Sequence, residues 1–473
     1  MSNVSELSSN RSAKAFLKVA LILLASVAST IFTAETAAQN EPTPAPISFS
    51  RDVAPILAKK CLTCHGPEKA KGGYRLHIFE LMLKAGDDET APIVPGKPEQ
   101  SGLYRRLITK DDEDRMPQKD DPLSAALIGL IERWIREGAR FDGSDPKALL
   151  TSIIPQGPHP SPPTTYRQPV PLTAVAFSPD GRELAVGGYH EITIWDPSSG
   201  KLLRRIKNVA QRTQSLAYQP RGSFLAATGG SPGQAGEVAL FNPVEGSLVK
   251  VLGTMSDMVL SVCFSEDGTR LAAGGADNAI HLYDVGSGKE QLLIQQHADW
   301  VLAVAFDQEG SHIASASRDR SARIYDSKTG ELEMTYADHG APVFGIGFSS
   351  DGKSAYSGGR DKKIHVWNIK DAKKSGELSG FEEDIIKLLA KGGYVFSCSA
   401  DRLVRQHDAK EQKLVHTYSG HKDWVYTLDY HSATSRLATG SHDGEVRIWS
   451  TEDGKLQTVF VAAPGYLTAD SSK

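Results

Sequence analysis

Two patterns of hydrophobic and polar positions divide the chain. Between residues 171 and 465, short runs of alternating apolar and polar residues are separated by Gly/Asp turns, which is typical of β-strands. Between residues 47 and 145, apolar residues recur at helical spacing. Helices are expected over 52–60 and over 124–138, the second starting at Ser and ending at Gly. The pattern therefore predicts a small all-α domain followed by an all-β domain.

The β region repeats with a period of about 40–45 residues, as "SVCFSEDGTRLAAGGADNAIHLYD" and "AVAFDQEGSHIASASRDRSARIYD" illustrate. Each unit reads as an alternating strand, a DG-like turn, a second strand, a tight turn and a third strand that ends on an aromatic residue. This marker falls at Trp195, Phe241, Tyr283, Tyr325, Trp367 and Trp449, with His407 in its place in the sixth unit. Such a period with four strands per unit predicts a β-propeller of seven blades.

The ends and joints of the domains differ in composition from the domains themselves. Residues 1–38 begin with basic residues, continue as an uncharged apolar run and end in small residues, the layout of a signal peptide. We therefore expect export, to a periplasm or beyond, and no membrane span after cleavage; an uncleaved anchor is the alternative. Residues 39–46 form a Pro-rich tether, 146–170 a Pro-rich linker and 466–473 a tail.

Charge and cysteine content narrow the function further. The chain has 473 residues and a formal net charge of −4, so bulk electrostatics favour no nucleic-acid partner. Four cysteines are too few for a disulfide framework. Cys263 and Cys398 stand alone in strand-like runs, where a free thiol acts as a small hydrophobe. A disulfide between them is left open.

The other two cysteines stand in "CLTCHG", as Cys61 and Cys64 followed by His65. A zinc site needs a second Cys/His pair, and a thioredoxin-type pair belongs near a βαβ pattern. Neither context is present, whereas Cys-x-x-Cys-His is the attachment pattern of c-type haem. Two thiols one helical turn apart can form thioethers to a porphyrin, which places His65 as proximal iron ligand. We expect one covalent haem c.

A second axial ligand has to come from elsewhere in the helical domain. Met116 lies in a polar loop, where a thioether has no packing reason, and Pro117 follows it. Met/His ligation is common in small cytochromes, so Met116 is the predicted distal ligand and His77 the runner-up. Met82 lies in an apolar run and is expected in the core. Acidic residues 111–114 either steer a basic redox partner or form a solvated loop.

Four blocks in order resemble one family: "FSRDVAPILAKKCLTCHGPEKAKGGYRLHIFE", "IVPGKPEQSGLYRRL", "RMPQ" and "PLSAALIGLIERWIREGARF". Together they resemble the planctomycete-type cytochrome c domain over residues 49–141. The resemblance implies a helical class I-like cytochrome that carries haem.

The β repeats resemble the WD40 family, with Trp195-Asp196 as the name-giving pair and Gly420-His421 as its companion. The resemblance implies that a His, a Ser/Thr, an Asp and a Trp form a hydrogen-bonded set in each blade. The matching positions are His421, Ser441, Asp443 and Trp449; His297, Ser317, Asp319 and Tyr325; and His339, Asp361 and Trp367, with Gly359 at the hydroxyl position. We expect these residues to be structural.

The same resemblance implies a binding surface on the narrow top face of the propeller. Trp300 and Trp424 precede the inner strands, and Arg318, Arg360 and His442 precede the tight-turn residue. Exposed Trp beside Arg is the composition of interface hot spots. The alternative is that each Trp covers the rim of its own blade.

Taken together, these patterns predict an exported electron-transfer haem protein whose propeller binds a protein partner, a redox protein among the candidates. No catalytic residue is assigned. One alternative is a redox enzyme with its active site in the propeller and the cytochrome as electron relay. The other is a scaffold with a vestigial haem motif.

Overall fold

The computed structural model describes residues 46–466, apart from 68, 119–120, 144, 155–156, 234 and 256. The predicted signal peptide, almost all of the tether and most of the C-terminal tail lie outside the described residues. Among the residues that are described, none of the helices combines the length and apolar character needed to cross a bilayer.

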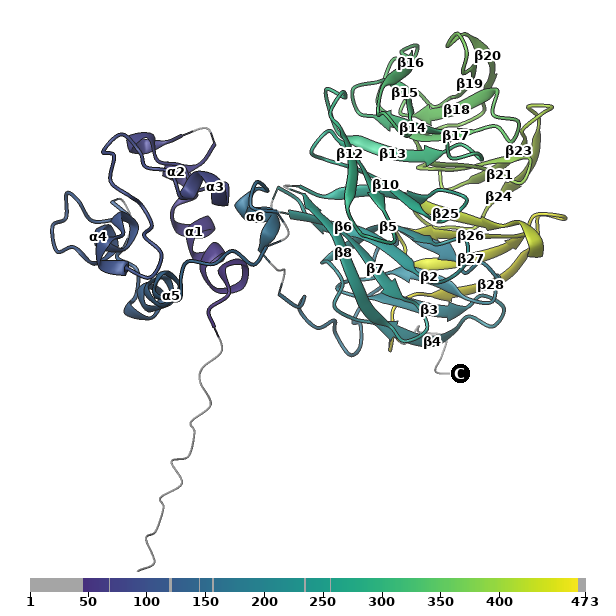
Figure 1. Ribbon diagram of the computed structural model, residues 1–473. Coiled ribbons are helices and arrows are strands. Elements are labelled where there is room, and N and C mark those ends of the chain that lie inside the picture. The colour runs from purple at the N-terminus through teal and green to yellow at the C-terminus, as the bar shows by residue number, and fades with distance from the viewer. Residues whose placement is uncertain are drawn as a thin grey trace, which may run out of the picture. The chain divides into compact units, whose positions relative to one another are not determined.

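The N-terminal region contains short helices and no paired strands among its described residues (Figure 1). These are η1 Phe49–Val53, α1 Ala54–Lys60, α2 Leu62–His65, η2 Lys71–Gly73, α3 Phe79–Met82, η3 Pro98–Gln100, α4 Gly102–Ile108, α5 Ala125–Arg136 and α6 Leu150–Ile153. The helix expected over 52–60 begins earlier, as η1 running into α1. The helix expected over 124–138 is α5, and the hydroxyl of its N-cap residue Ser124 accepts a hydrogen bond from Leu127 N.

An aromatic cluster forms the core of the helical region. The ring of Phe49 lies 4.9 Å from that of Phe79 and 5.1 Å from that of Trp134, measured between centroids. Phe141 closes the cluster at 4.7 Å from Phe79. Trp134 is fully buried, and its indole N–H donates to the carbonyl of Arg140 at 3.0 Å, so burial leaves no polar atom of the ring unpaired. Aromatic pairs of this kind add about 0.5–1.5 kcal/mol each beyond their buried area.

The C-terminal region consists of seven sheets, each of four strands that are consecutive in the chain. The first three blades contain β1 Val175–Phe177, β2 Leu184–Gly187, β3 Ile192–Asp196, β4 Lys201–Ile206; β5 Arg212–Tyr218, β6 Leu225–Ser231, β7 Ala235–Asn242, β8 Ser247–Met255; and β9 Val259–Phe264, β10 Arg270–Gly275, β11 Ile280–Asp284, β12 Glu290–Ile294. The next two contain β13 Val301–Phe306, β14 His312–Ser317, β15 Ala322–Asp326, β16 Leu332–Tyr336; and β17 Val343–Phe348, β18 Ser354–Gly359, β19 Ile364–Asn368, β20 Lys374–Leu378. The last two contain β21 Ile385–Lys391, β22 Tyr394–Ser399, β23 Val404–Asp408, β24 Leu414–Tyr418; and β25 Val425–His431, β26 Arg436–Ser441, β27 Glu445–Ser450, β28 Leu456–Val461.

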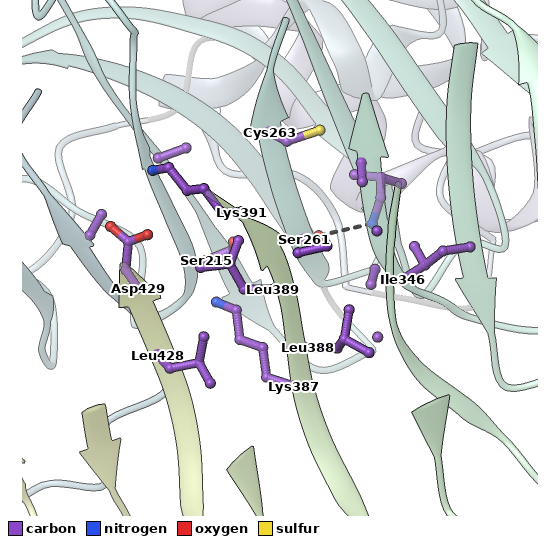
Figure 2. Close-up of a pocket in the computed structure, with 18 of the residues that line it drawn as sticks. Ser215, Ser261, Cys263, Ile346, Lys387, Leu388, Leu389, Lys391, Leu428 and Asp429 are labelled. Carbon is purple, nitrogen blue, oxygen red and sulfur yellow. Dashed lines mark hydrogen bonds between the residues drawn. The ribbon is translucent and has the colours of Figure 1, made fainter. Parts of the chain in front are cut away.

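This arrangement confirms the predicted seven-bladed all-β propeller. The first strand of every blade lines a central cavity, so β1, β5, β9, β13, β17, β21 and β25 are the inner strands (Figure 2). The DG-like turns predicted after the inner strands are present, and Gly268 and Gly352 hold φ values of +70° and +65° there. That left-handed conformation is the reason for glycine at these two positions.

The ring closes without exchange of a strand between its first and last blades. At the seam, Phe177 N donates to Asp429 Oδ2 at 2.7 Å and Val175 N donates to Thr427 Oγ1 at 3.2 Å. The chain that enters β1 adds a strap: Leu172 N donates to the Ser441 carbonyl, and Tyr166 N donates to the Pro464 carbonyl. The end of the Pro-rich linker is thus part of the closure.

The predicted hydrogen-bonded sets are present in part. The hydroxyl member lies two residues earlier in the strand than predicted. Two of the predicted members lack a hydrogen bond: the Tyr325 hydroxyl has no partner among the described residues, and His421 Nδ1 lies 3.7 Å from Asp443.

In the fourth blade, His297 donates through Nδ1 to Asp319 at 2.8 Å and accepts at Nε2 from the Ser315 hydroxyl at 2.6 Å. Ser315, not the predicted Ser317, completes the set. Both face the same side of β14, but Ser317 lies at the strand end, where its hydroxyl bonds the Asp299 carbonyl instead.

The other two blades show the same shift by two residues. His421 bonds Thr439 at 2.8 Å rather than Ser441, whose hydroxyl bonds the Asp423 carbonyl. In the fifth blade, Ser357 occupies the hydroxyl position, accepting from Trp367 Nε1 at 3.0 Å and bonding His339 Nε2 at 2.7 Å. The set of the fifth blade therefore has its hydroxyl group, although Gly359 stands at the predicted position.

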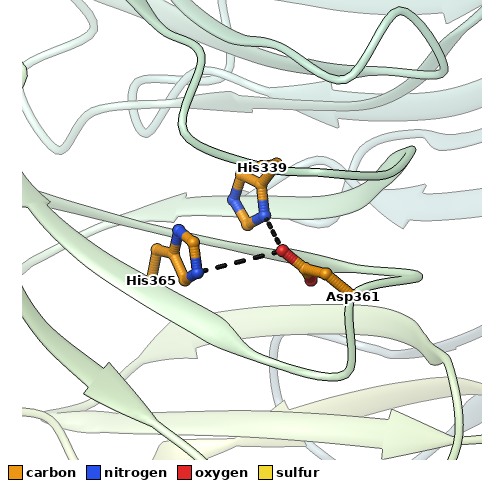
Figure 3. A group of neighbouring side chains, drawn as sticks. All are labelled: His339, Asp361 and His365. Carbon is orange, nitrogen blue, oxygen red and sulfur yellow. Dashed lines mark hydrogen bonds and ion pairs between the residues drawn. The ribbon is translucent and has the colours of Figure 1, made fainter.

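The fifth blade adds a second imidazole to its set, that of His365 (Figure 3). His339 Nδ1 lies 2.6 Å and His365 Nε2 3.8 Å from Asp361 Oδ2. Three ligand-type groups this close invite comparison with a metal site, but the two rings stack at 4.2 Å with an interplanar angle of 11°. A metal binds in the plane of an imidazole, and two parallel planes share no such point. His339, Asp361 and His365 in this arrangement are part of the hydrogen-bonded set that stabilises the blade.

The buried His365 makes the stability of the propeller sensitive to acid. Burial first, and the neighbouring His339 second, lower its pKa to about 4. A folded-state pKa below the unfolded value of about 6.5 favours the neutral ring, so this stabilisation is complete above about pH 6.5 and is lost as the pH falls toward 4. The loss amounts to about 3 kcal/mol. Urea midpoints measured across this range should fall, and His365→Gln should make the fall less steep. His407, whose pKa burial also lowers to about 4, accounts for part of the fall that remains.

His281 supplies the control. Burial would lower its pKa, but hydrogen bonds to Asp277 and Glu290 outweigh that effect and raise it to about 9. Its stabilisation is therefore present below about pH 6.5 and disappears only above 9. His281→Gln should destabilise the protein at neutral pH but leave unchanged the fall of the urea midpoint between pH 6.5 and 4. An unchanged slope in His365→Gln would contradict the assignment.

Candidate functional site

The Cys-x-x-Cys-His motif forms one helical turn at the end of α1. Cys61 N donates to the Leu57 carbonyl at 2.9 Å, which continues the helix into the motif. Cys64 N and His65 N then both donate to the Cys61 carbonyl, at 3.1 and 3.0 Å. Both cysteines are free and half-buried. At this spacing the two side chains share one face of the turn, with the imidazole next to them.

A backbone carbonyl orients the imidazole of His65. Nδ1 lies 3.1 Å from the Tyr74 carbonyl oxygen, which can only accept, so Nδ1 carries the proton. Nε2 then keeps its lone pair. Metal-ligating histidines are typically held in this way, with the non-ligating N–H bound to a carbonyl or carboxylate. Leu76 N donates to the His65 carbonyl at 2.7 Å and fixes the returning chain beside the ring.

These observations fit a c-type haem at this turn. The chain supplies two thiols on one face and an imidazole whose tautomer leaves Nε2 free to bind iron. Burial first, and Cys64 second, raise the pKa of Cys61 to about 12. Redox-active Cys-x-x-Cys pairs show the opposite shift, because their chemistry needs a thiolate. The thioredoxin-type alternative is therefore not favoured by the surroundings of Cys61.

The three candidates for the distal ligand differ in their surroundings. Met82 is fully buried in α3, which confirms its expected place in the core. Met116 is half-buried in the loop after α4, where its backbone N donates to the Arg106 carbonyl at 2.8 Å. His77 is buried, and its Nδ1 has no hydrogen-bond partner in the described part of the chain. No hydrogen bond or ring contact of the described residues joins these side chains to His65, so Met116 as ligand stays a prediction.

The residues predicted for the interaction face lie next to one another in pairs. The Arg318 guanidinium covers the Trp300 ring at 4.2 Å and donates to Asp299 at 2.7 Å. Trp424 is 51% exposed, and the backbone N of His442 donates to its carbonyl.

Arg360 stands apart from these pairs. Its guanidinium lies 3.7 Å from an Asp384 carboxylate oxygen. Arg360 and Trp424 both line the central cavity. The structure thus pairs the side chains of Trp300 and Arg318 and places Arg360 and Trp424 in the lining of the central cavity. The role of these residues in binding stays a prediction.

Some residues of these sites carry no sequence signal. The Tyr74 carbonyl is a backbone atom, and no side-chain pattern announces it. Tyr426, by contrast, could have been found in the sequence, because it stands two residues after Trp424 in an alternating strand and so faces the same side. The centroid of its ring lies 6.2 Å from that of Trp424. Lys387, a charge within the apolar run "IIKLLAK", is a visible anomaly that the repeat pattern alone did not explain.

Comparison with known families places both parts of the chain. Residues 61–120 match the planctomycete cytochrome C family, a segment that holds Cys61, Cys64, His65 and Met116. The WD domain, G-beta repeat, matches at 161–196, 246–284, 288–326, 330–368 and 412–450. These segments leave out the first three strands of the second and sixth blades, β5 to β7 and β21 to β23, and the sequences of these two repeats depart most from the pattern.

Curated relatives are similar to short parts of the chain. A protein of Arabidopsis thaliana named cell division cycle 20.1, cofactor of APC complex, is 33% identical over 118 residues, 24% of this chain and 24% of that protein. THO complex subunit 6 of Arabidopsis thaliana is 34% identical over 70 residues, 15% of this chain and 19% of its own. Eukaryotic translation initiation factor 3 subunit I of Aspergillus fumigatus is 35% identical over 85 residues, 18% and 25% of the two chains. The matches span about a quarter of these relatives or less. The chain thus combines a segment of the planctomycete cytochrome C family with a seven-bladed propeller of WD40 repeats.

Proposed function

We propose that the protein is an exported c-type cytochrome that transfers single electrons and uses its propeller to bind a protein partner. The observation that carries the proposal is the orientation of His65 by the Tyr74 carbonyl, on the same turn as two free thiols. A carbonyl-held imidazole has Nε2 available as a ligand, and the thiols stand where thioethers to a porphyrin would form. Export is proposed because residues 1–38 read as a signal peptide.

Each residue of the site has a distinct task in this proposal. A bound haem supplies an iron that changes oxidation state by one electron. Cys61 and Cys64 would hold the porphyrin covalently, and His65 Nε2 would bind the iron. The Tyr74 carbonyl keeps the proton on Nδ1 and so fixes the ring. If Met116 fills the sixth position, no coordination site remains for a substrate, which favours electron transfer over oxidase or peroxidase chemistry.

The propeller is proposed as the platform that binds a partner protein. Its relatives named above are a cofactor of a complex and subunits of two others. On this chain, the exposed Trp424 and the Trp300–Arg318 pair are the aromatic and guanidinium groups that recur in interface hot spots.

Covalent attachment is tested on the purified mature protein. The haem should survive acid-acetone extraction, because thioether bonds resist it. Cys61→Ala or Cys64→Ala should weaken retention and the double variant should abolish it, whereas Cys263→Ala in the propeller should leave it unchanged. Mass spectrometry that finds free thiols at 61 and 64, after expression with a working haem-attachment system, would refute the proposal and favour a vestigial motif.

The distal ligand is tested with a matched pair of conservative variants. Met116→Leu should remove the weak near-infrared absorbance of sulfur–iron coordination and lower the reduction potential. Met82→Leu should change neither, since a volume-conserving swap in the core costs less than about 1.5 kcal/mol. A larger effect from Met82→Leu, or none from either variant, would make the assignment wrong and His77 the leading candidate.

The binding face is tested by comparing exposed and buried tryptophans. Trp300→Ala and Trp424→Ala should leave the melting temperature and haem spectrum nearly unchanged but slow interprotein electron transfer or reduce partner capture. Trp367→Ala, at a fully buried position, should instead cost about 3–5 kcal/mol of stability. Full binding by the Trp300 and Trp424 variants to every identified partner would assign these residues to blade structure.

A further inference from the structure

The inner strands of the propeller enclose a channel-like cavity of about 1380 Å³. Residues of all seven inner strands line it, and the wall mixes apolar side chains, Ile346, Leu388 and Leu428 among them, with charged ones, including the acids Glu266, Asp307 and Asp429 (Figure 2). A cavity that combines apolar surface with a few placed polar groups is the usual form of a ligand site.

One position of the inner strand carries a hydroxyl in three of the blades. The pairing of the first and second strands of these blades shifts register near the start of the inner strand, and the position is one of the two paired residues that flank the shift. Its occupants are Ser215 opposite Thr228, Ser261 opposite Gly274, and Thr427 opposite Gly440. Each hydroxyl oxygen accepts from the backbone N of the next blade's inner strand. The three N···O distances are 3.3, 3.2 and 3.2 Å. The position thus joins neighbouring blades.

In the sixth blade, Lys387 occupies this position, opposite Cys398. An ammonium group cannot accept, so it cannot make the bond between blades. Its side chain points from β21 into the cavity, with Lys391 farther along the same strand (Figure 2). In the described part of the chain, the hydrogen bonds of Nζ comprise one contact, with Thr427 Oγ1 at 3.4 Å. Two of its three donors are therefore open toward the cavity.

The charge of Lys387 is also left without a direct partner. Among the described residues, no carboxylate lies within ion-pair distance of Nζ; Asp429 acts on it only from farther away. Both oxygens of Asp429 are engaged, by Phe177 N at 2.7 Å and by Tyr430 N at 2.9 Å. Burial lowers the pKa of Lys387, and Cys398 and Asp429 offset this only in part. A buried ammonium in this state costs free energy that an anion would recover.

We propose that the central cavity binds a small monocarboxylate with an apolar body, its carboxylate on the Lys387 ammonium. The Lys387 ammonium with the adjacent Thr427 hydroxyl matches a single negative charge. Of the other cations that line the cavity, Lys391 lies four residues farther along β21 and Arg360 lies 3.7 Å from Asp384, so a phosphate dianion would have to draw on cations away from Lys387.

The apolar wall formed by residues such as Leu388 and Leu428 matches the body of such a ligand. The proposed site shares no residue with the Cys-x-x-Cys-His turn, Cys61 to His65, which we call the haem turn.

The experiment uses the full-length mature protein and three probes at constant ionic strength: sodium hexanoate, 1-hexanol and inorganic phosphate. Hexanoate at about ten times its Kd should raise the melting temperature by about 2 °C, because it binds only the folded state. Hexanol lacks the charge and should give a smaller shift. Lys387→Met should weaken hexanoate binding at least tenfold by calorimetry, the loss expected for a charged hydrogen bond. Lys391→Met, at an exposed position of the same strand, should leave it unchanged.

Reductive methylation gives a second measurement that does not depend on a variant. Mass spectrometry should show that hexanoate protects the Lys387 amine and leaves Lys391 labelled. The proposal is overturned if hexanoate and hexanol shift the protein equally, if Lys387→Met retains affinity, or if Lys391→Met is the variant that loses it. Stronger binding of phosphate than of hexanoate would overturn the assigned ligand class.

Discussion

Closing seven twisted sheets into a ring leaves one joint that the chain does not run through, and the propeller depends on how that joint is made. Here the first and last blades each complete their own four strands, so no exchanged strand ties them. Backbone amides of β1 instead bond the side chains of Thr427 and Asp429 on β25. The Thr427 bond is of the same kind that Ser215 and Ser261 make between other blades, and the Asp429 bond adds a second contact at this joint.

The same two residues also set the environment of Lys387. Asp429 spends both oxygens on backbone amides, and Thr427 Oγ1 accepts from Val175 N while it contacts Nζ. Asp429 therefore makes no direct ion pair with the ammonium and offsets its burial only in part. At the haem turn the logic is similar: a backbone carbonyl, from Tyr74, decides what a side chain can do. In both places a hydrogen bond to a backbone group determines which atoms of the side chain remain available to a ligand.

The sequence allowed the architecture to be predicted, because period and alternation are properties of the whole chain and tolerate local exceptions such as His407 in place of an aromatic residue. The hydroxyl of each blade set was misplaced by two residues, since Ser315 and Ser317 share a face and only their level along the strand separates them. The Cys-x-x-Cys-His turn could be found in the sequence because its spacing is local, and the matching family suggests haem binding. The distal ligand was not, since the choice between Met116 and His77 depends on a loop path that no periodicity encodes.

The strap before β1 gives the linker a mechanical role. Tyr166 and Leu172 bond the Pro464 and Ser441 carbonyls of the last blade just as the chain enters the first. A covalent tether that arrives there delivers any tension directly to the one joint of the ring that lacks a continuous backbone. The hydrogen bonds of Tyr166 and Leu172 stand at the end of that tether, so a pull along the linker reaches them before it reaches the bonds between β1 and β25.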